Sequence, residues 1–151
     1  MEDYERAYKN RLLDIDALLA ANIPRITAAT HLGGVAIECR LKALVITYHS
    51  IKEWGEPSKR VGDPRFRVPI GRTSHGLISA VKLMSTLYKK AMADRHFLNH
   101  LSDVTYPTGS TVTDFIALRY SSHDLDGQAL VNWKRSFDYV IGWLEKNEKL
   151  L

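Results

Sequence analysis

The sequence contains a single cysteine, Cys39, and no apolar run near the roughly 20 residues that a membrane-spanning helix requires. A lone cysteine excludes an internal disulfide, and its apolar neighbours predict a small buried side chain. The first residues, Met1 to Tyr4, are acidic and lack the basic flank and apolar stretch of a secretory signal peptide. These absences favour a cytoplasmic protein that does not associate with a membrane.

Internal repeats and low-complexity segments are also absent, and the composition is that of an ordinary globular domain. Of the 151 residues, 45% are hydrophobic and 25% are charged. A chain of this length can bury a core of its own, so we expect one domain over residues 1–151. Apolar residues recur every three or four positions in five segments: 3–20, 24–49, 74–91, 94–103 and 126–144. The pattern predicts an all-α fold, an antiparallel bundle of four to five helices.

The second of these segments is apolar around most of its circumference. At about 100° per residue, four polar side chains fall on one line along the helix: His31, Glu38, Lys42 and His49. A helix this apolar belongs at the centre of a bundle, so the line faces either water or a polar site. Glu38 and Lys42 also stand in the favourable order for an ion pair within one helix.

Two long connections, 53–73 and 104–118, exceed the usual loop length in compact domains. The first contains three prolines and three glycines, which exclude a helix, while its residues 65–70 alternate in the manner of a short edge strand. The stretch from Lys52 to Ser74 contains six cationic and three anionic residues, a surplus of three positive charges. Such a run is either a solvated surface or a patch that attracts phosphates.

Three short motifs occur in order along the chain: Ala36-x-Glu38-x-x-Leu41-Lys42-Ala43-Leu44, His75-Gly76-Leu77 and Arg119-Tyr120-Ser121. Together they resemble the HEPN domain, a family named for nucleotide binding in higher eukaryotes and prokaryotes. The resemblance covers nearly the whole chain and implies a helical bundle that forms a homodimer. It also implies either a binding or scaffold module or a metal-independent ribonuclease of a defence or toxin–antitoxin system. A cognate nucleotidyltransferase-like protein is a further implied partner.

The ribonuclease members carry an Arg followed four to six residues later by a His, and Arg95 and His100 fit that spacing. The resemblance implies that His100 exchanges a proton with the 2′-hydroxyl or the leaving oxygen while Arg95 stabilises the transition state, with two pairs meeting across a dimer. A plainer interpretation makes His96, His100 and Asp103 the polar face of an amphipathic helix. The same three have the spacing of metal ligands, but no cluster completes a site, so we expect no metal and no cofactor.

A second candidate pair, Arg119 and His123, precedes the last predicted helix. Helix N-termini favour anions, so we expect Arg119 and His123 to hold a phosphate, with the Tyr120 ring as a stacking surface. The alternative is that Arg119 pairs with Asp124 or Asp126 and that Tyr120 packs in the core.

Two functional hypotheses follow, and the sequence slightly favours the first. One is a HEPN-like module that binds a nucleotide or an RNA phosphate, or a partner protein, with Glu38, Lys42 and His75 among the binding residues. The other is a metal-independent endoribonuclease that uses the Arg95–His100 pair. The last helix also has more aromatic surface than one core face needs: Trp133, Phe137, Tyr139 and Trp143.

Overall fold

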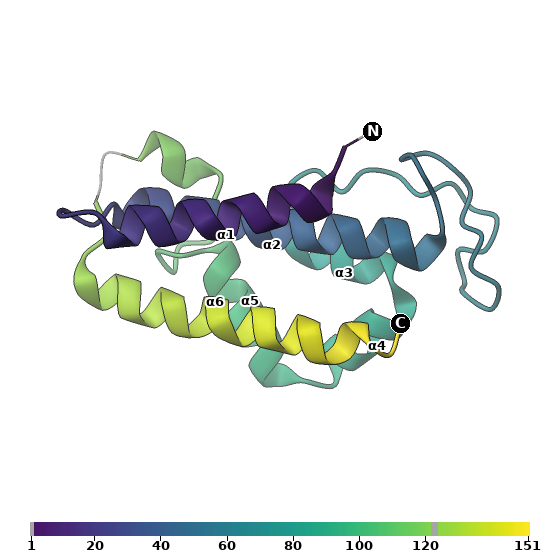
Figure 1. Ribbon diagram of the computed structural model, residues 1–151. Coiled ribbons are helices and arrows are strands. Elements are labelled where there is room, and N and C mark those ends of the chain that lie inside the picture. Colours follow the sequence, from purple (N-terminus) through teal and green to yellow (C-terminus); the bar gives the residue numbers. More distant parts are fainter. Residues whose placement is uncertain (1, 122–123) are drawn as a thin grey trace.

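The protein is a helical bundle in the computed structural model, which describes residues 2–121 and 124–151. The elements in chain order are α1 (Tyr4–Ala20), α2 (Ile26–His49), α3 (Leu77–Leu83), α4 (Ser85–Met92), α5 (Arg95–Thr105), the 3-10 helix η1 (Ala117–Tyr120) and α6 (Gly127–Glu148). The rods α1, α2 and α6 run the length of the molecule, with the shorter helices beside them (Figure 1). The all-α prediction is confirmed. None of the described helices is long and apolar enough to span a membrane.

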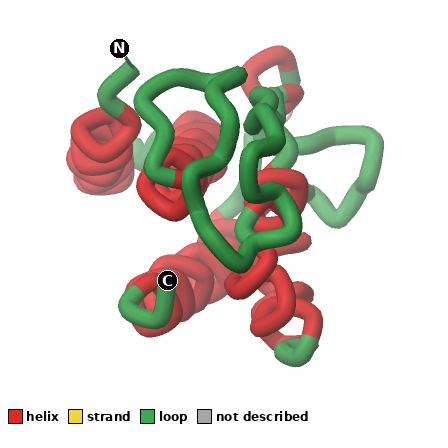
Figure 2. Tube along the Cα trace, turned by 90° about the vertical axis from the view of Figure 1, so that its right-hand side faces the viewer, coloured by secondary structure: helices red, strands yellow, loops and turns green. Residues whose placement is uncertain are grey.

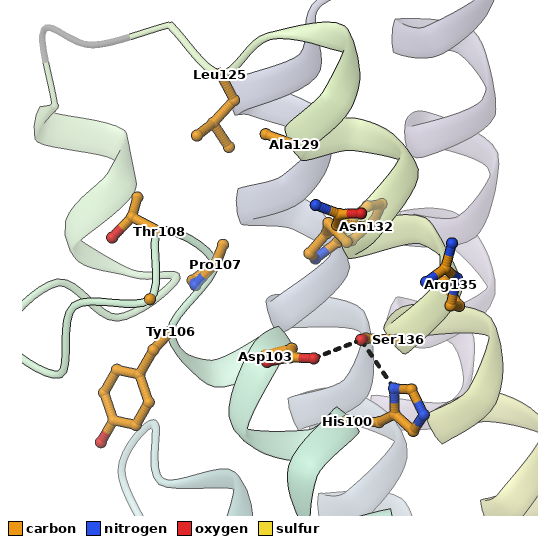
Figure 3. Close-up of a pocket in the computed structure, with 12 residues that line it drawn as sticks. His100, Asp103, Tyr106, Pro107, Thr108, Leu125, Ala129, Asn132, Arg135 and Ser136 are labelled. Atoms are coloured by element: carbon orange, nitrogen blue, oxygen red, sulfur yellow. Dashed lines mark hydrogen bonds between the residues drawn. The ribbon is translucent and has the colours of Figure 1, made fainter.

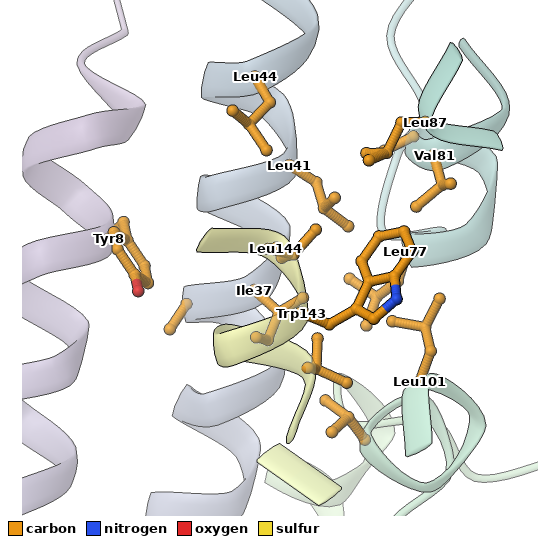
Figure 4. Close-up of a cluster of buried hydrophobic side chains, with 14 of the residues drawn as sticks. Tyr8, Ile37, Leu41, Leu44, Leu77, Val81, Leu87, Leu101, Trp143 and Leu144 are labelled. Carbon is orange, nitrogen blue, oxygen red and sulfur yellow. The ribbon is translucent and has the colours of Figure 1, made fainter. Parts of the chain in front are cut away.

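Helix α2 lies at the centre of the bundle, as its apolar surface predicts. It packs against α1, α3, α5, α6 and η1. Its residues Ile37, Leu41 and Val45 are completely buried. The neighbouring helices enclose them with further buried side chains, among them Tyr8, Leu77, Leu101 and Leu144 (Figure 4).

Two adjacent glycines in α2 allow aromatic rings to approach the backbone of this helix closely. A β-carbon added at Gly33 would lie 2.1 Å from the Trp133 ring, and one added at Gly34 would lie 2.1 Å from the Phe115 ring. Both distances are far inside van der Waals contact, so only glycine leaves room for these aromatic rings. The pair therefore seats α6 and the connection before η1 directly on the backbone of α2.

The predicted helix over 74–91 is two helices in the structure. Ser74 has a φ of 52° and does not cap the first of them, which begins after Gly76. Met84 is buried with an extended backbone (φ −105°, ψ 91°), and this residue separates α3 from α4. Met84 is buried in the core although it is not helical, so the apolar periodicity continues across it. The sequence pattern therefore does not reveal the break between α3 and α4.

The predicted edge strand over 65–70 is also wrong, since the described residues contain no strand. The connection forms only isolated bridges, Pro57 with Pro69 and Ser58 with Phe66. Two prolines facing each other lack the N–H groups that would extend a ladder.

Cys39 is half-buried rather than buried, and burial raises the pKa of its thiol.

The polar line of α2 serves chiefly to fasten the two long connections. His31 Nδ1 lies 2.7 Å from the carbonyl oxygen of Phe115, and Glu38 contacts His75. At the end of the helix the buried His49 donates to the carbonyl of Leu83 through Nε2 (2.8 Å), while Nδ1 lies 2.7 Å from the Ser58 hydroxyl. Figure 2 shows the connection between α2 and α3 folded over this end of the bundle.

The glycine contacts predict the outcome of single alanine substitutions. We expect Gly33→Ala and Gly34→Ala each to lower the free energy of unfolding by about 1–3 kcal/mol through overpacking. Gly142→Ala in α6 is the matched control, because a β-carbon there meets nothing within 4 Å. Alanine at position 142 should raise stability by up to about 1 kcal/mol through helix propensity. Urea unfolding measures all three, and equal effects at the three positions would contradict the close packing.

His49 predicts a pH dependence of stability. Burial lowers the pKa of His49 below the ordinary value, so the unfolded chain takes up a proton first as the pH falls. The stabilisation is complete above the unfolded pKa of about 6.5 and is lost progressively below it. His49→Gln should therefore be less stable at neutral pH and lose less further stability towards about pH 5, whereas the exposed-site variant His96→Gln should follow the parent chain. Parallel stability curves for the parent chain and His49→Gln would contradict this account.

Candidate functional site

A pocket of about 580 Å³ lies between α5, α6 and the segment 106–109 that follows α5. Its volume is within the range of small-molecule sites. One wall is the irregular segment and the other is helical, as Figure 3 shows. The polar side chains of the helical wall are His100, Asp103, Asn132, Arg135 and Ser136.

His100, Ser136 and Asp103 form a hydrogen-bonded array in this pocket. The Ser136 hydroxyl donates to Asp103 Oδ2 over 2.8 Å and lies 2.9 Å from His100 Nδ1 (Figure 3). Since the single hydroxyl proton is given to the carboxylate, Nδ1 must carry the proton that it shares with Ser136. The imidazole also stacks on Tyr139, with 4.2 Å between ring centroids. In the neutral ring, Nε2 is then the nitrogen with a free lone pair.

The start of α5 is fixed to α6 by Asp94. One carboxylate oxygen caps α5 by accepting from the backbone N–H of Phe97 (3.1 Å), and the other accepts from Trp143 Nε1 (3.0 Å). The first of these bonds is the main reason that the pKa of Asp94 lies below its ordinary value. Phe97 in turn stacks on Trp143. These contacts set the register of the two helices and so bring His100 opposite Ser136.

Arg95 does not join His100 in the pocket. It is exposed at the first residue of α5 and forms no ion pair or side-chain hydrogen bond with the residues that the structure describes. His96 is exposed as well. Within residues 2–121 and 124–151, no group of three His, Cys, Asp or Glu residues could hold a metal ion. Within one chain, His100 is thus associated with Ser136 and Asp103 rather than with Arg95.

Arg119 and Tyr120 form an exposed pair on η1. The Arg119 guanidinium lies 4.6 Å from the centre of the Tyr120 ring, and Tyr120 is 79% exposed. The alternative in which Tyr120 packs in the core is therefore wrong. In the described part of the chain Arg119 forms no ion pair with Asp124 or Asp126.

The N-terminus of α6 is capped by a carboxylate of the chain itself. Asp126 Oδ1 accepts from the backbone N–H of Ala129 over 2.8 Å. This carboxylate engages one of the free N–H groups at the helix end where the sequence predicts a bound phosphate, and its negative charge disfavours an anion there. The predicted partner His123 lies outside the described residues.

Glu38, Lys42 and His75 form a second, separate cluster. Glu38 Oε1 is 2.5 Å from Lys42 Nζ, and Oε2 is 3.0 Å from His75 Nδ1. The Lys42 ammonium also lies 5.8 Å from the centre of the Tyr4 ring. Because the carboxylate of Glu38 already engages both basic groups, the cluster joins α2 to the start of α3 and offers a phosphate little free charge.

Most aromatic side chains of α6 pack against other helices of the same chain. Trp133, Phe137 and Trp143 are buried, since α6 packs on both α2 and α5, and Tyr139 covers His100. The aromatic surface beyond the needs of one core face therefore packs against a second helix of the same chain, and Tyr139 stays 36% exposed.

Sequence reasoning placed His100 and Asp103 on one helical face but missed Ser136, Asn132 and Arg135. Nothing in the sequence marks Ser136, because its role depends on how α6 crosses α5.

No protein-family model, curated protein or solved structure matches the chain. The motifs that resemble HEPN domains lie in α2, in the turn before α3 and at η1, and the first two touch through Glu38 and His75.

The array predicts a defined tautomer of His100. In the parent chain at a pH where the ring is neutral, we expect the proton on Nδ1. Ser136→Ala removes the group that holds the proton there, so the Nδ1–H population should fall, whereas Ser102→Ala on the exposed face of α5 should leave it unchanged. Ring-nitrogen chemical shifts measure both populations, and an unchanged tautomer in Ser136→Ala would disprove the array.

Proposed function

We propose that the protein is a HEPN-like module that binds RNA or a nucleotide in the α5–α6 pocket. The observation that carries the proposal is the pocket itself, whose size suits a nucleotide unit and whose polar groups match its parts. Arg135 supplies donors for a phosphate. Asp103 accepts from ribose hydroxyls, and Asn132 offers an amide for a base edge.

The exposed Arg119–Tyr120 pair supports the same function. Tyr120 precedes the pocket residue Leu125 by five residues, a stretch of chain that spans at most about 18 Å. A guanidinium and an open aromatic ring stack on bases and contact phosphates in many single-strand binders. An RNA longer than one nucleotide can therefore reach the pocket and η1 together.

A second candidate function is metal-independent cleavage of RNA, and the orientation of His100 favours it. With the proton on Nδ1, Nε2 can take the proton of a ribose 2′-hydroxyl as that oxygen attacks the adjacent phosphorus. The bond between phosphorus and the 5′-oxygen breaks, the departing oxygen takes a proton from water, and a 2′,3′-cyclic phosphate remains. His100 then returns the proton that it took to the solvent. Arg95 would stabilise the charge on phosphorus from the second chain of a homodimer, the arrangement that the HEPN resemblance implies.

Binding is tested by fluorescence anisotropy with a labelled single-stranded RNA and by titration with AMP. We expect Arg135→Ala and Arg119→Ala each to weaken RNA binding about tenfold, the equivalent of about 1.4 kcal/mol for a charged hydrogen bond. Arg6→Ala, an exposed arginine of α1, is the control and should bind as the parent chain does. Equal affinity of the parent chain, Arg135→Ala and Arg119→Ala would contradict the proposal and leave a scaffold role.

Cleavage is tested by incubating the protein with RNA in EDTA. If His100 is the base, His100→Ala should lose at least about 100-fold in rate, and Arg95→Ala should also be impaired. His96→Ala replaces an exposed histidine on the same helix and should retain the activity. Absence of cleavage by the parent chain, or cleavage that survives His100→Ala, would remove the enzymatic function without affecting the binding proposal.

A further inference from the structure

A separate cleft of about 520 Å³ lies where the connection after α2 meets α3 and α4. Each of these three elements contributes one cation to its lining: Arg65, Lys82 and Lys89. The remaining lining residues are Ser85, Tyr88 and Met92. The cleft therefore has a positive rim and contains no carboxylate among its lining residues.

The position of Arg65 at this cleft is fixed by the buried Asp63. This carboxylate accepts from the Tyr48 hydroxyl (2.7 Å), from the backbone N–H of Arg65 (2.8 Å) and from the Ser85 hydroxyl. Burial alone would raise the pKa of Asp63, but these hydrogen bonds outweigh it and lower the pKa, so Asp63 stays ionised. The connection is thus tied to the first residue of α4, and Arg65 is held beside the lysines rather than on a loose loop.

The three cations of the cleft have no carboxylate at ion-pair distance within the described chain. Two other cations of the same connection do form ion pairs, Lys59 with Glu56 and Arg72 with Glu2. Arg65, Lys82 and Lys89 form no ion pair among the described residues. Like charges held together without a partner repel one another, and a bound polyanion relieves that repulsion.

We propose that this cleft binds the sugar–phosphate backbone of single-stranded RNA, independently of the α5–α6 pocket. The guanidinium of Arg65 suits the geometry of phosphate oxygens, and the two lysines extend the charge along a run of phosphates. The half-buried Tyr88 ring provides a surface against which a sugar or base packs. Met92, 57% exposed, is the only large apolar side chain open to solvent in the cleft, which is too little apolar surface for insertion into a bilayer.

The test compares the full chain with the triple variant Arg65→Gln, Lys82→Gln and Lys89→Gln. Binding of a labelled oligouridine is measured by anisotropy between about 50 and 300 mM salt. Three lost phosphate contacts should reduce the slope of log affinity against log salt by about 2, and lower the affinity at about 0.1 M salt on the order of 100-fold. The hydrogen bonds of Asp63 are unaffected by these changes, and thermal melting verifies the fold.

The control is a second triple variant, Arg6→Gln, Lys9→Gln and Arg25→Gln, which removes the same charge from exposed residues of α1 and the segment before α2. It should keep the parent slope. Equal losses in both triple variants, or an unchanged slope in the first, would overturn the proposal. A cleft variant that loses binding to phosphatidylglycerol vesicles but keeps binding to RNA would also overturn the proposal.

Arg135→Ala tests the α5–α6 pocket alone. It should leave the slope difference between the triple variants intact, so the two proposals fail separately.

Discussion

The close contact between α2 and two aromatic rings is the constraint on which the rest of the structure depends. Trp133 rests against Gly33 and belongs to the pocket wall on α6, while Phe115 rests against Gly34 and ends the connection that forms the opposite wall. The two sides of the pocket are therefore built on neighbouring residues of one central helix. A bulkier residue at either glycine would displace one wall relative to the other.

The polar residues of the fold divide into those that the fold uses and those that it leaves available. His31, Glu38 and His49 attach connections to α2, and each forms hydrogen bonds within the chain. Other groups have no such partner among the described residues, among them Arg135 and the Nε2 side of His100 beside the α5–α6 pocket and the cations of the α3–α4 cleft. The polar groups that attach segments of the chain to α2 are thus distinct from those that we propose bind RNA, although both sets include the same residue types.

The helices and the central position of α2 could be predicted from the sequence, because apolar periodicity reports directly on which face is buried. The break at Met84 could not, since the buried methionine continues the pattern of the helices on either side of it. The site was predicted only in part. His100 was identified, but its companions Ser136 and Arg135 come from a helix whose crossing angle depends on the glycine contacts, and no local signal encodes that angle. Asp126 shows the converse: a residue visible in the sequence as a helix cap also places a negative charge at the predicted anion site.

The most direct test of the central claim, that the α5–α6 pocket is a ligand site, is a map of the bound surface. Amide and side-chain chemical shifts of the isotope-labelled full chain would be followed during titration with a short single-stranded RNA. The account predicts saturable shifts at His100, Asn132 and Arg135, with contacts between ribose protons and the pocket residues. Saturable binding whose shifts leave these three residues unmoved would contradict it.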